Sequence, residues 1–310
     1  MKTAQPVCAA PLEAPHPANT CAIIVTYFPD AGFEQRLCII EQQFSQVILI
    51  DNASQAESAR RLDGLVSGAG RHAIRNRQNL GIACALNQGL AFADARGCQW
   101  AVTFDQDSEI GGDLLETLAN VYRAMPGANH LFGVNYWNPH YGRFLVPTQP
   151  GRIGVARATI ITSGMLIPLA LVREIGGFRE DYFIDAVDHE FCLRVRAQGG
   201  KVILACKPAM IHGFGETAGR RYFRWAGINH HGPARKYFIA RNSLVTALAY
   251  WRREPLWSLR QCARLLIDFG GIVLLEAHKR AKLSAFMRGI THALAGKMGP
   301  IAGHDGKEIR

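Results

Sequence analysis

Short apolar runs alternate with segments of helical periodicity over residues 21–136. A short apolar run bounded by polar or turn residues predicts a buried strand, whereas apolar residues three and four apart predict a helix. The strands expected on this basis lie at 21–27, 47–50, 72–75 and 99–105. The helices expected between them lie at 33–43, 56–66 and 82–96. Strands that alternate with helices of this length predict a mostly parallel sheet with helices on its faces.

The pattern changes twice towards the C-terminus. Residues 137–160 are irregular, and we then expect a strand at 159–167, an acidic segment that runs into a short helix, and a last strand at 202–205. Beyond residue 219 the pattern is helical. We therefore expect three parts, which are a flexible, proline-containing leader over 1–20, an α/β domain over 21–218 and a basic helical region over 219–310.

The charge is concentrated in the C-terminal part. The chain carries a net charge of +10, and residues 220–288 contain fourteen Lys and Arg against three acidic residues. Such a balance indicates an anionic partner, such as a nucleotide or a lipid head group. No nucleic-acid recognition motif accompanies the charge, so we expect no nucleic-acid partner. These helices mix aromatic, aliphatic and cationic residues, and either lie in an anionic membrane interface or pack on the α/β domain with a solvated basic face.

Cysteine usage and the apolar runs bear on the cellular location. The eight cysteines form no Cys-x-x-Cys pair, which favours free thiols in a reducing cytosol over disulfides or zinc. No apolar run approaches the length of a membrane-spanning helix. We expect a cytoplasmic protein that is soluble or peripheral on the inner face of the cell membrane.

Two carboxylates one residue apart end the apolar run at 99–105. Residues i and i+2 of an extended chain point the same way, so Asp105 and Asp107 can face one ligand together. At the carboxyl edge of an open α/β sheet this geometry suits a divalent cation held between carboxylate and phosphate oxygens. His212 follows the last expected strand, where a neutral imidazole can complete the metal shell. A solvated turn and a structural histidine are the ordinary alternatives.

Polar residues at two other strand ends suit a nucleotide. Asp51 ends the second expected strand, where a carboxylate accepts a hydrogen bond from a ribose or a base, or else forms an Asx turn or helix cap. Asn79 and Gly81 open a helix whose amides can bind a phosphate or ribose, although capping explains them equally well. Neither Gly-x-Gly-x-x-Gly after the first strand nor Gly-x-x-x-x-Gly-Lys-Ser/Thr occurs, which disfavours a dinucleotide site and a P-loop.

An acidic segment lies between the last two expected strands. Asp185, Asp188 and Glu190 fall within six residues, with aromatic residues on either side. Asp185 and Asp188 are three apart and share one face of a helical turn. A partly desolvated carboxylate there can act as a general base on a hydroxyl, and the alternative is an acidic first turn favoured by the helix dipole.

Taken in order, these segments resemble the inverting family 2 glycosyltransferases of the GT-A fold, and among them the bacterial rhamnosyltransferases of the rhamnolipid and O-antigen type. The resemblance covers about residues 22–242 and rests on the ordered set Thr26-Tyr27-Phe28, Ile50–Ser54, Asn79–Ala83, Asn87-Gln88-Gly89, Phe104–Ser108, Ser163-Gly164, Gly177-Phe178, Phe183–Glu190, His212 and Arg235–Asn242. It implies an α/β fold in which a Rossmann-like, mostly parallel sheet is flanked by helices, with a C-terminal helical extension.

The resemblance also implies roles for individual residues. The nucleotide sugar would be bound by Thr26, Tyr27, Asp51, Asn79, Gly81 and Asp105. Asp107 and His212 would hold Mg²⁺ or Mn²⁺ on the diphosphate. Asp188 would be the catalytic base, although the acid that precedes it in many members is Val187 here. The sugar or the acceptor would be bound by Ser163, Gly164, Asp185 and Glu190.

The expected function is metal-dependent, inverting transfer of L-rhamnose from dTDP-rhamnose to a hydroxyl of a cell-envelope glycan or glycolipid. Another nucleotide sugar, carrying galactofuranose or N-acetylglucosamine, is the alternative within the family. A sugar-phosphate nucleotidyltransferase shares the nucleotide and metal requirements, but residues 27–32 lack the Gly-rich basic loop that triphosphate chemistry needs. A non-catalytic binding module is disfavoured by the presence of Asp107, Asp188 and His212.

Overall fold

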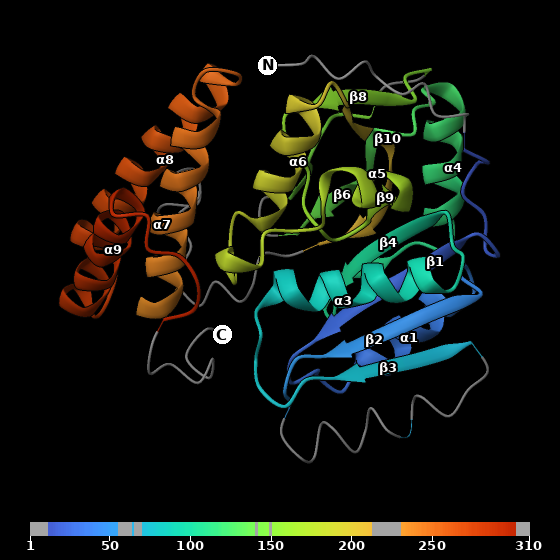
Figure 1. The fold of residues 1–310 in the computed structure, drawn as a ribbon, viewed down its shortest axis with the longest axis horizontal. Coiled ribbons are helices and arrows are strands. Elements are labelled where there is room, and N and C mark those ends of the chain that lie inside the picture. Colours follow the sequence, from blue (N-terminus) through green and yellow to red (C-terminus); the bar gives the residue numbers. More distant parts are fainter. Residues whose placement is uncertain are drawn as a thin grey trace.

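A mixed β-sheet forms the centre of the molecule (Figure 1). The computed structural model describes residues 12–54, 64, 70–139, 142–148, 151–212 and 231–301. Within these residues the sheet has ten strands in the order β3-β2-β1-β4-β9-β6-β10-β5, with β7 beside β6 and β8 beside β10. Three C-terminal helices stand to one side of this α/β part (Figure 1).

The first half of the sheet is parallel, as the sequence predicts. It consists of β3 (Arg71–Arg75), β2 (Gln46–Asp51), β1 (Thr20–Thr26) and β4 (Trp100–Asp105). The second half is mixed, because β9 (Met165–Pro168) runs antiparallel between β4 and β6 (Leu131–Asn138), while β10 (Val202–Ile211) is parallel to β6. The short strands β5 (Glu109–Ile110) and β8 (Gly154–Arg157) pair with β10, and β7 (Arg143–Phe144) pairs with β6.

Strand β6 was not predicted, because polar residues and a glycine interrupt its apolar pattern. Asn135 is fully buried within it, and its side-chain amide donates to the carbonyl oxygens of Val146 (2.9 Å) and Cys206 (3.0 Å). These bonds offset the cost of burying a polar side chain, so a central strand tolerates it. The strand expected at 159–167 is confined to β9, and the one expected at 202–205 extends to Ile211 as β10.

Helices cover both faces of the sheet. One face is packed by α3 (Ile82–Ala95), α5 (Leu169–Ile175) and α6 (Val187–Ala197), and the other by α1 (Phe33–Glu41) and α4 (Leu114–Ala124). Strand β1 shows the alternation that this requires, since Cys21, Ile23 and Val25 face α3 and Ala22 and Ile24 face the opposite side. The helix expected at 56–66 falls almost entirely outside the described residues.

Residues 12–20 lie against the sheet and do not form part of a flexible leader. The indole N–H of Trp100 donates to the carbonyl oxygen of Glu13 (2.9 Å), and the hydroxyl of Tyr122 donates to that of Leu12 (2.5 Å). Thr20 already belongs to β1. The expectation of a flexible leader is therefore wrong for residues 12–20, and residues 1–11 lie outside the described part of the chain.

The C-terminal helices α7 (Pro233–Tyr250), α8 (Pro255–Leu274) and α9 (Lys279–Leu294) form a bundle. Apolar side chains from all three meet in its centre, and the buried carboxylate of Glu276 pairs with two buried ammonium groups, Lys236 (2.8 Å) and Lys282 (2.6 Å). The α7 helix also packs on α6, so the bundle is joined to the α/β part. Among the described residues, no helix has the length and apolar character needed to cross a membrane.

Candidate active site

A cleft of about 780 Å³ opens at the carboxyl ends of β1, β2 and β4. Tyr27 and Asn52 directly follow β1 and β2, and Asp105 ends β4. Ligands of open α/β sheets bind at this edge, because the loops after parallel strands converge there. The opposite wall is supplied by α7 and α8, which contribute Arg235 and Arg264 among other residues. The C-terminal helices are therefore part of the candidate site.

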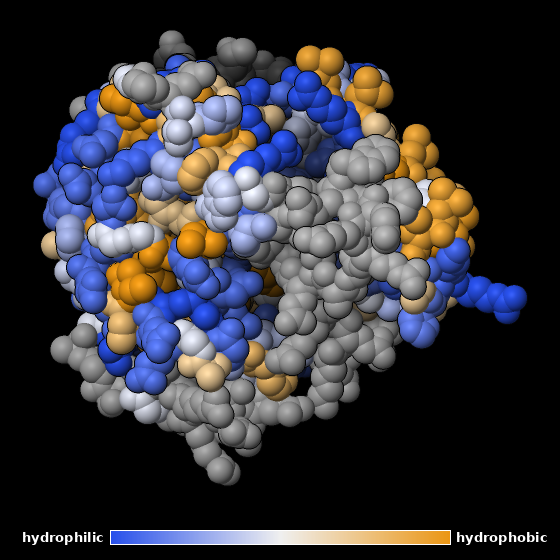
Figure 2. Space-filling model, turned by 180° about the vertical axis from the view of Figure 1, so that it is seen from behind, coloured by the Kyte–Doolittle hydropathy of each residue, from blue (hydrophilic) through white to orange (hydrophobic). Residues whose placement is uncertain are grey.

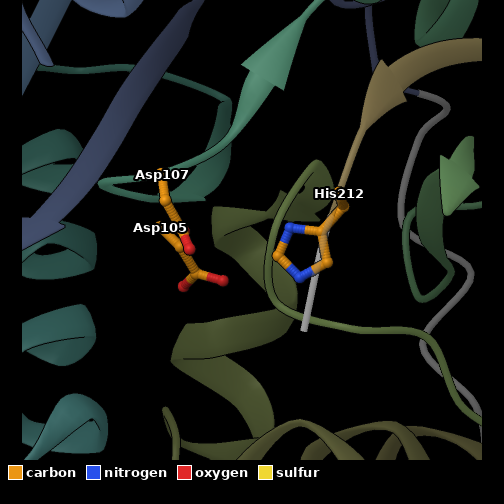
Figure 3. A group of neighbouring side chains, drawn as sticks. All are labelled: Asp105, Asp107 and His212. Atoms are coloured by element: carbon orange, nitrogen blue, oxygen red, sulfur yellow. The ribbon is translucent and has the colours of Figure 1, made fainter. Parts of the chain in front are cut away.

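Asp105, Asp107 and His212 form a cluster in this cleft (Figure 3). One ligand atom from each side chain lies within 4.8 Å of the other two. The pairing of β5 with β10 brings them together, because Glu109 pairs with Ile211 and Ile110 with Met210. Asp107 therefore lies two residues before, and His212 one residue after, the same antiparallel pair.

The charge distribution around Asp105 favours a bound cation. The pKa of Asp105 is raised to about 6, mainly by burial and to a lesser degree by the negative charges of Asp107 and Asp188, whereas His212 and Arg235 oppose the shift. A divalent cation would offset both the burial and the repulsion between carboxylates. Two carboxylates and an imidazole are a donor set that Mg²⁺ or Mn²⁺ accepts. The residues present therefore fit the expected metal.

Asp188 lies in the first turn of α6 and lines the same cleft. Its side-chain oxygen Oδ1 accepts a hydrogen bond from the backbone N–H of His189 (2.8 Å). The loop before it holds three non-glycine residues in the left-handed region, namely Phe183 (φ 67°), Asp185 (φ 62°) and Ala186 (φ 58°). Such conformations cost of order 1–3 kcal/mol each and persist only where the surrounding structure enforces them.

Arg241 and Asn242 of α7 hold this loop, which spans residues 181–186. Both side chains are fully buried. The Asn242 amide donates to the carbonyl oxygens of Tyr182 (2.9 Å), Ile184 (2.7 Å) and Asp185 (3.0 Å). The Arg241 guanidinium donates to those of Asp181 and Tyr182 (both 3.1 Å), and its Nε donates to the side-chain oxygen of Asn242 (2.9 Å). Both residues belong to the segment Arg235–Asn242 that resembles the glycosyltransferase family, but this role was not predicted for them.

Asp185 and Arg235 both line the cleft and contact each other. Their side chains form an ion pair of 3.3 Å that joins the 181–186 loop to α7. Burial raises the pKa of Asp185, and the Arg235 guanidinium lowers it. Arg235 was not among the expected site residues. Its sequence signal was weak, because it is one of many cations in the C-terminal part.

The expected nucleotide-binding residues divide into two groups. Tyr27, Asn79 and Gly81 line the cleft. The φ of Gly81 is +84°, and a Cβ there would lie 2.5 Å from the carbonyl oxygen of Phe183, so this close approach requires glycine. Asn52 also lines the cleft and was not predicted, although it follows Asp51 at the same strand end. Its side chain donates to Asn79 (2.8 Å) and accepts the backbone N–H of Leu80 (3.0 Å).

Thr26 and Asp51 are placed behind this surface. Neither Thr26 nor Asp51 is among the described residues that line the cleft. Thr26 is fully buried in β1, and Asp51 is buried and accepts the backbone N–H of Ser54 (3.1 Å). The bond to Ser54 is the local turn that was the structural alternative for Asp51.

Ser163, Gly164 and Glu190 also lie outside the described lining of the cleft, which differs from the expectation that they contact the sugar or the acceptor. The hydroxyl of Ser163 is buried against that of Ser108, and Gly164 packs on Val134. Glu190 is buried and pairs with Arg194 (2.9 Å). Because Asp188 and Glu190 are two apart in a helix, their side chains point in different directions, and only Asp188 faces the cleft.

Comparison with known proteins gives matches over most of the chain. Residues 21–144 match the family model described as Glycosyl transferase family 2. The dTDP-rhamnosyl transferase RfbF of Shigella flexneri is 26% identical over 301 residues, which cover 92% of this chain and 98% of the relative.

Two solved structures share the fold at low sequence identity. A fragment of S. aureus TarS in complex with UDP-GlcNAc superposes with a TM-score of 0.60 at 14% identity, over 90% of this chain and 83% of that fragment. The mannosyltransferase PcManGT from Pyrobaculum calidifontis, in complex with GDP-Man and Mn²⁺, gives 0.53 at 16% identity, over 94% and 92% of the two chains. The predicted GT-A fold with C-terminal helices is confirmed.

Proposed function

We propose that this glycosyltransferase, whose residues 21–144 form a family 2 domain, transfers L-rhamnose from dTDP-rhamnose to a hydroxyl group with inversion at the anomeric carbon. The observation that carries the proposal is that one cleft gathers Asp105, Asp107 and His212 beside Asp188. The choice of donor is supported by the S. flexneri relative, which is named a dTDP-rhamnosyl transferase.

The proposed reaction replaces one bond at the anomeric carbon by another. Asp188 takes the proton of the acceptor hydroxyl as that oxygen attacks the anomeric carbon. The bond from the same carbon to the diphosphate oxygen breaks on the opposite face, which inverts the configuration, and the nucleoside diphosphate leaves with the bonding electrons. Arg235 faces the cleft and stabilises negative charge on the departing group. A divalent cation held by Asp105, Asp107 and His212 would supply further charge neutralisation on the diphosphate.

The proposal extends to the organisation and location of the protein. Residues 21–218 are the catalytic domain in this proposal, and α7 and α8 complete its cleft. The acceptor is a glycan or glycolipid of the cell envelope, and the enzyme works in the cytoplasm or at the inner face of the membrane. Mg²⁺ or Mn²⁺ is the cofactor.

A thermal-shift screen tests the donor. dTDP, dTDP-rhamnose, UDP-N-acetylglucosamine and UDP-galactofuranose are each added with Mg²⁺, with Mn²⁺ and with EDTA. We expect dTDP and dTDP-rhamnose to raise the unfolding temperature more than the UDP sugars, and only with a divalent cation. A UDP sugar that stabilises the protein more than dTDP-rhamnose would replace the proposed donor by the alternative within the family.

A further inference from the structure

Helix α8 carries an uncovered apolar face. Leucine, isoleucine and valine recur three or seven residues apart along one side of the helix, and we call the set the α8 apolar face: Leu256, Leu259, Leu266, Ile267, Val273 and Leu274. Leu266 and Leu274 are the most exposed members of this set, with 74% and 73% of their surface accessible. Hydrophobic residues also gather on the surface of the C-terminal helices in the space-filling view (Figure 2).

The other side of α8 packs against the rest of the chain and lines the cleft. Leu265 and Ile272 are buried in the helical bundle, and Gln261, Arg264 and Asp268 line the cleft. At 100° per residue these inward positions lie on the side of the helix opposite to the apolar face. Among the described residues, packing within this chain therefore buries one side of α8 and leaves the apolar face uncovered.

The exposed charges around this face are all positive. Between residues 251 and 301 the exposed ionisable side chains with a formal charge are Arg252, Arg253, Arg260, Lys279, Arg280, Arg288 and Lys297. The acids of the same stretch are not exposed, since Glu254 pairs with Arg196, Asp268 with Arg264, and Glu276 with Lys236 and Lys282. Exposed cations thus stand just before α8 (Arg252 and Arg253), on it (Arg260) and just after it (Lys279 and Arg280), and no described acid of this stretch is exposed to offset them.

We propose that the α8 apolar face inserts into the interface of an anionic lipid bilayer, with the flanking cations on the lipid head groups. An amphipathic helix with one apolar side and a cationic border is the structure that binds in this way. A symmetric contact between two copies of this chain is disfavoured, because it would bring the same cations together without described exposed acids to pair with them.

This geometry also bears on the acceptor, a step that rests on the proposed function. An α-helix with its side chains is about 10–12 Å across. The cleft-lining residues Gln261, Arg264 and Asp268 would then lie within about one helix diameter of the head groups, since they are on the opposite side of α8 from the apolar face. The inferred acceptor class is a lipid-linked glycan whose sugar end reaches the cleft from the membrane.

Vesicle flotation with the full-length protein tests the membrane contact without requiring donor or acceptor. The vesicles are phosphatidylcholine alone or phosphatidylcholine with phosphatidylglycerol, at low and at high salt. The variants are Leu266→Asp, Leu266→Gln and the matched control Ile153→Asp, which introduces the same charge at a side chain that is 50% exposed on the α/β part. Circular dichroism and the thermal unfolding transition without ligand verify that each variant is folded.

We expect the wild-type protein and Ile153→Asp to float with the anionic vesicles at low salt, and less at high salt. Leu266→Gln should weaken binding about tenfold, and Leu266→Asp more, because each removes a buried apolar group from the interface. Absence of flotation at low salt, or equal binding by Leu266→Asp and Ile153→Asp, would overturn the proposal. Self-association that Leu266→Asp abolishes, without flotation, would assign the face to a contact between copies. A wrong donor in the thermal-shift screen would leave these outcomes unchanged.

Discussion

Replacing Asn242 by alanine tests whether α7 holds the loop that carries the candidate base. The asparagine is fully buried, and its amide is bonded to three loop carbonyl oxygens. The carbonyl of Tyr182 keeps Arg241 and the backbone N–H of Ile184 as donors in the variant. The carbonyls of Ile184 and Asp185 lose the bond from Asn242, and the Arg241 Nε loses its acceptor.

The magnitude follows from these losses. Leaving a buried polar group without a partner costs about 1–3 kcal/mol. The two carbonyls alone amount to about 2–6 kcal/mol in the free energy of unfolding, and the loss at Arg241 adds to this. At about 2–4 °C for each kcal/mol, the unfolding temperature should fall by roughly 4–24 °C. Release of the loop also lets Phe183, Asp185 and Ala186 leave their left-handed conformations, which moves Asp188.

Calorimetry, nucleotide titration and turnover together give the readout. We expect Asn242→Ala to reduce the unfolding temperature, to change dTDP affinity little, and to lower turnover strongly. The control Asn120→Ala alters an exposed asparagine of α4 and should stay within about 0.5 kcal/mol of wild type. An unfolding temperature within about 2 °C of wild type would refute the reasoning, as would a loss of nucleotide affinity equal to the loss of turnover.

Further predictions concern the acidic residues of the cleft. Asp188→Asn should abolish turnover and leave nucleotide affinity nearly intact in calorimetric titration, and equal loss of both would argue against a role as the base. Asp107→Ala should remove the metal dependence of dTDP binding, so unchanged Mn²⁺-dependent binding would contradict its role as a ligand. Burial contributes most to raising the pKa of Asp105 from 3.8 to about 6 in the folded state. The folded protein therefore binds this proton more tightly than the unfolded chain, so its stability falls as the pH rises from about 4 to about 6 and stays lower above that range. Asp105→Asn should therefore raise the free energy of unfolding at pH 7.5 in EDTA by about 1–3 kcal/mol while abolishing metal-dependent binding, and a less stable variant would be inconsistent with this sign.

Local patterns gave most of the first half of the fold. The runs that became β1, β2 and β4 are mostly apolar, and the helix over 82–95 has a clear apolar stripe that packs on β1. The pair Asp105 and Asp107 was found from its place at the end of an apolar run, although β4 ends at Asp105 and Asp107 lies in the turn that follows rather than in an extended chain. The mixed second half was harder, because β6 contains buried polar groups whose partners lie 11 and 71 residues away.

The amino-acid sequence by itself determined the α/β character and the position of Asp105 and Asp107 at a strand end, because these rest on neighbours within a strand, whereas Asp188 as the candidate base and His212 as a candidate metal ligand came from the resemblance to family 2 glycosyltransferases. Only the tertiary structure decided that His212 meets Asp107, through the pairing of β5 with β10, and that Glu190 turns away to Arg194. It also decided that Arg241 and Asn242 hold the loop before Asp188. Contacts of this kind depend on the packing of whole elements, which no local spacing encodes.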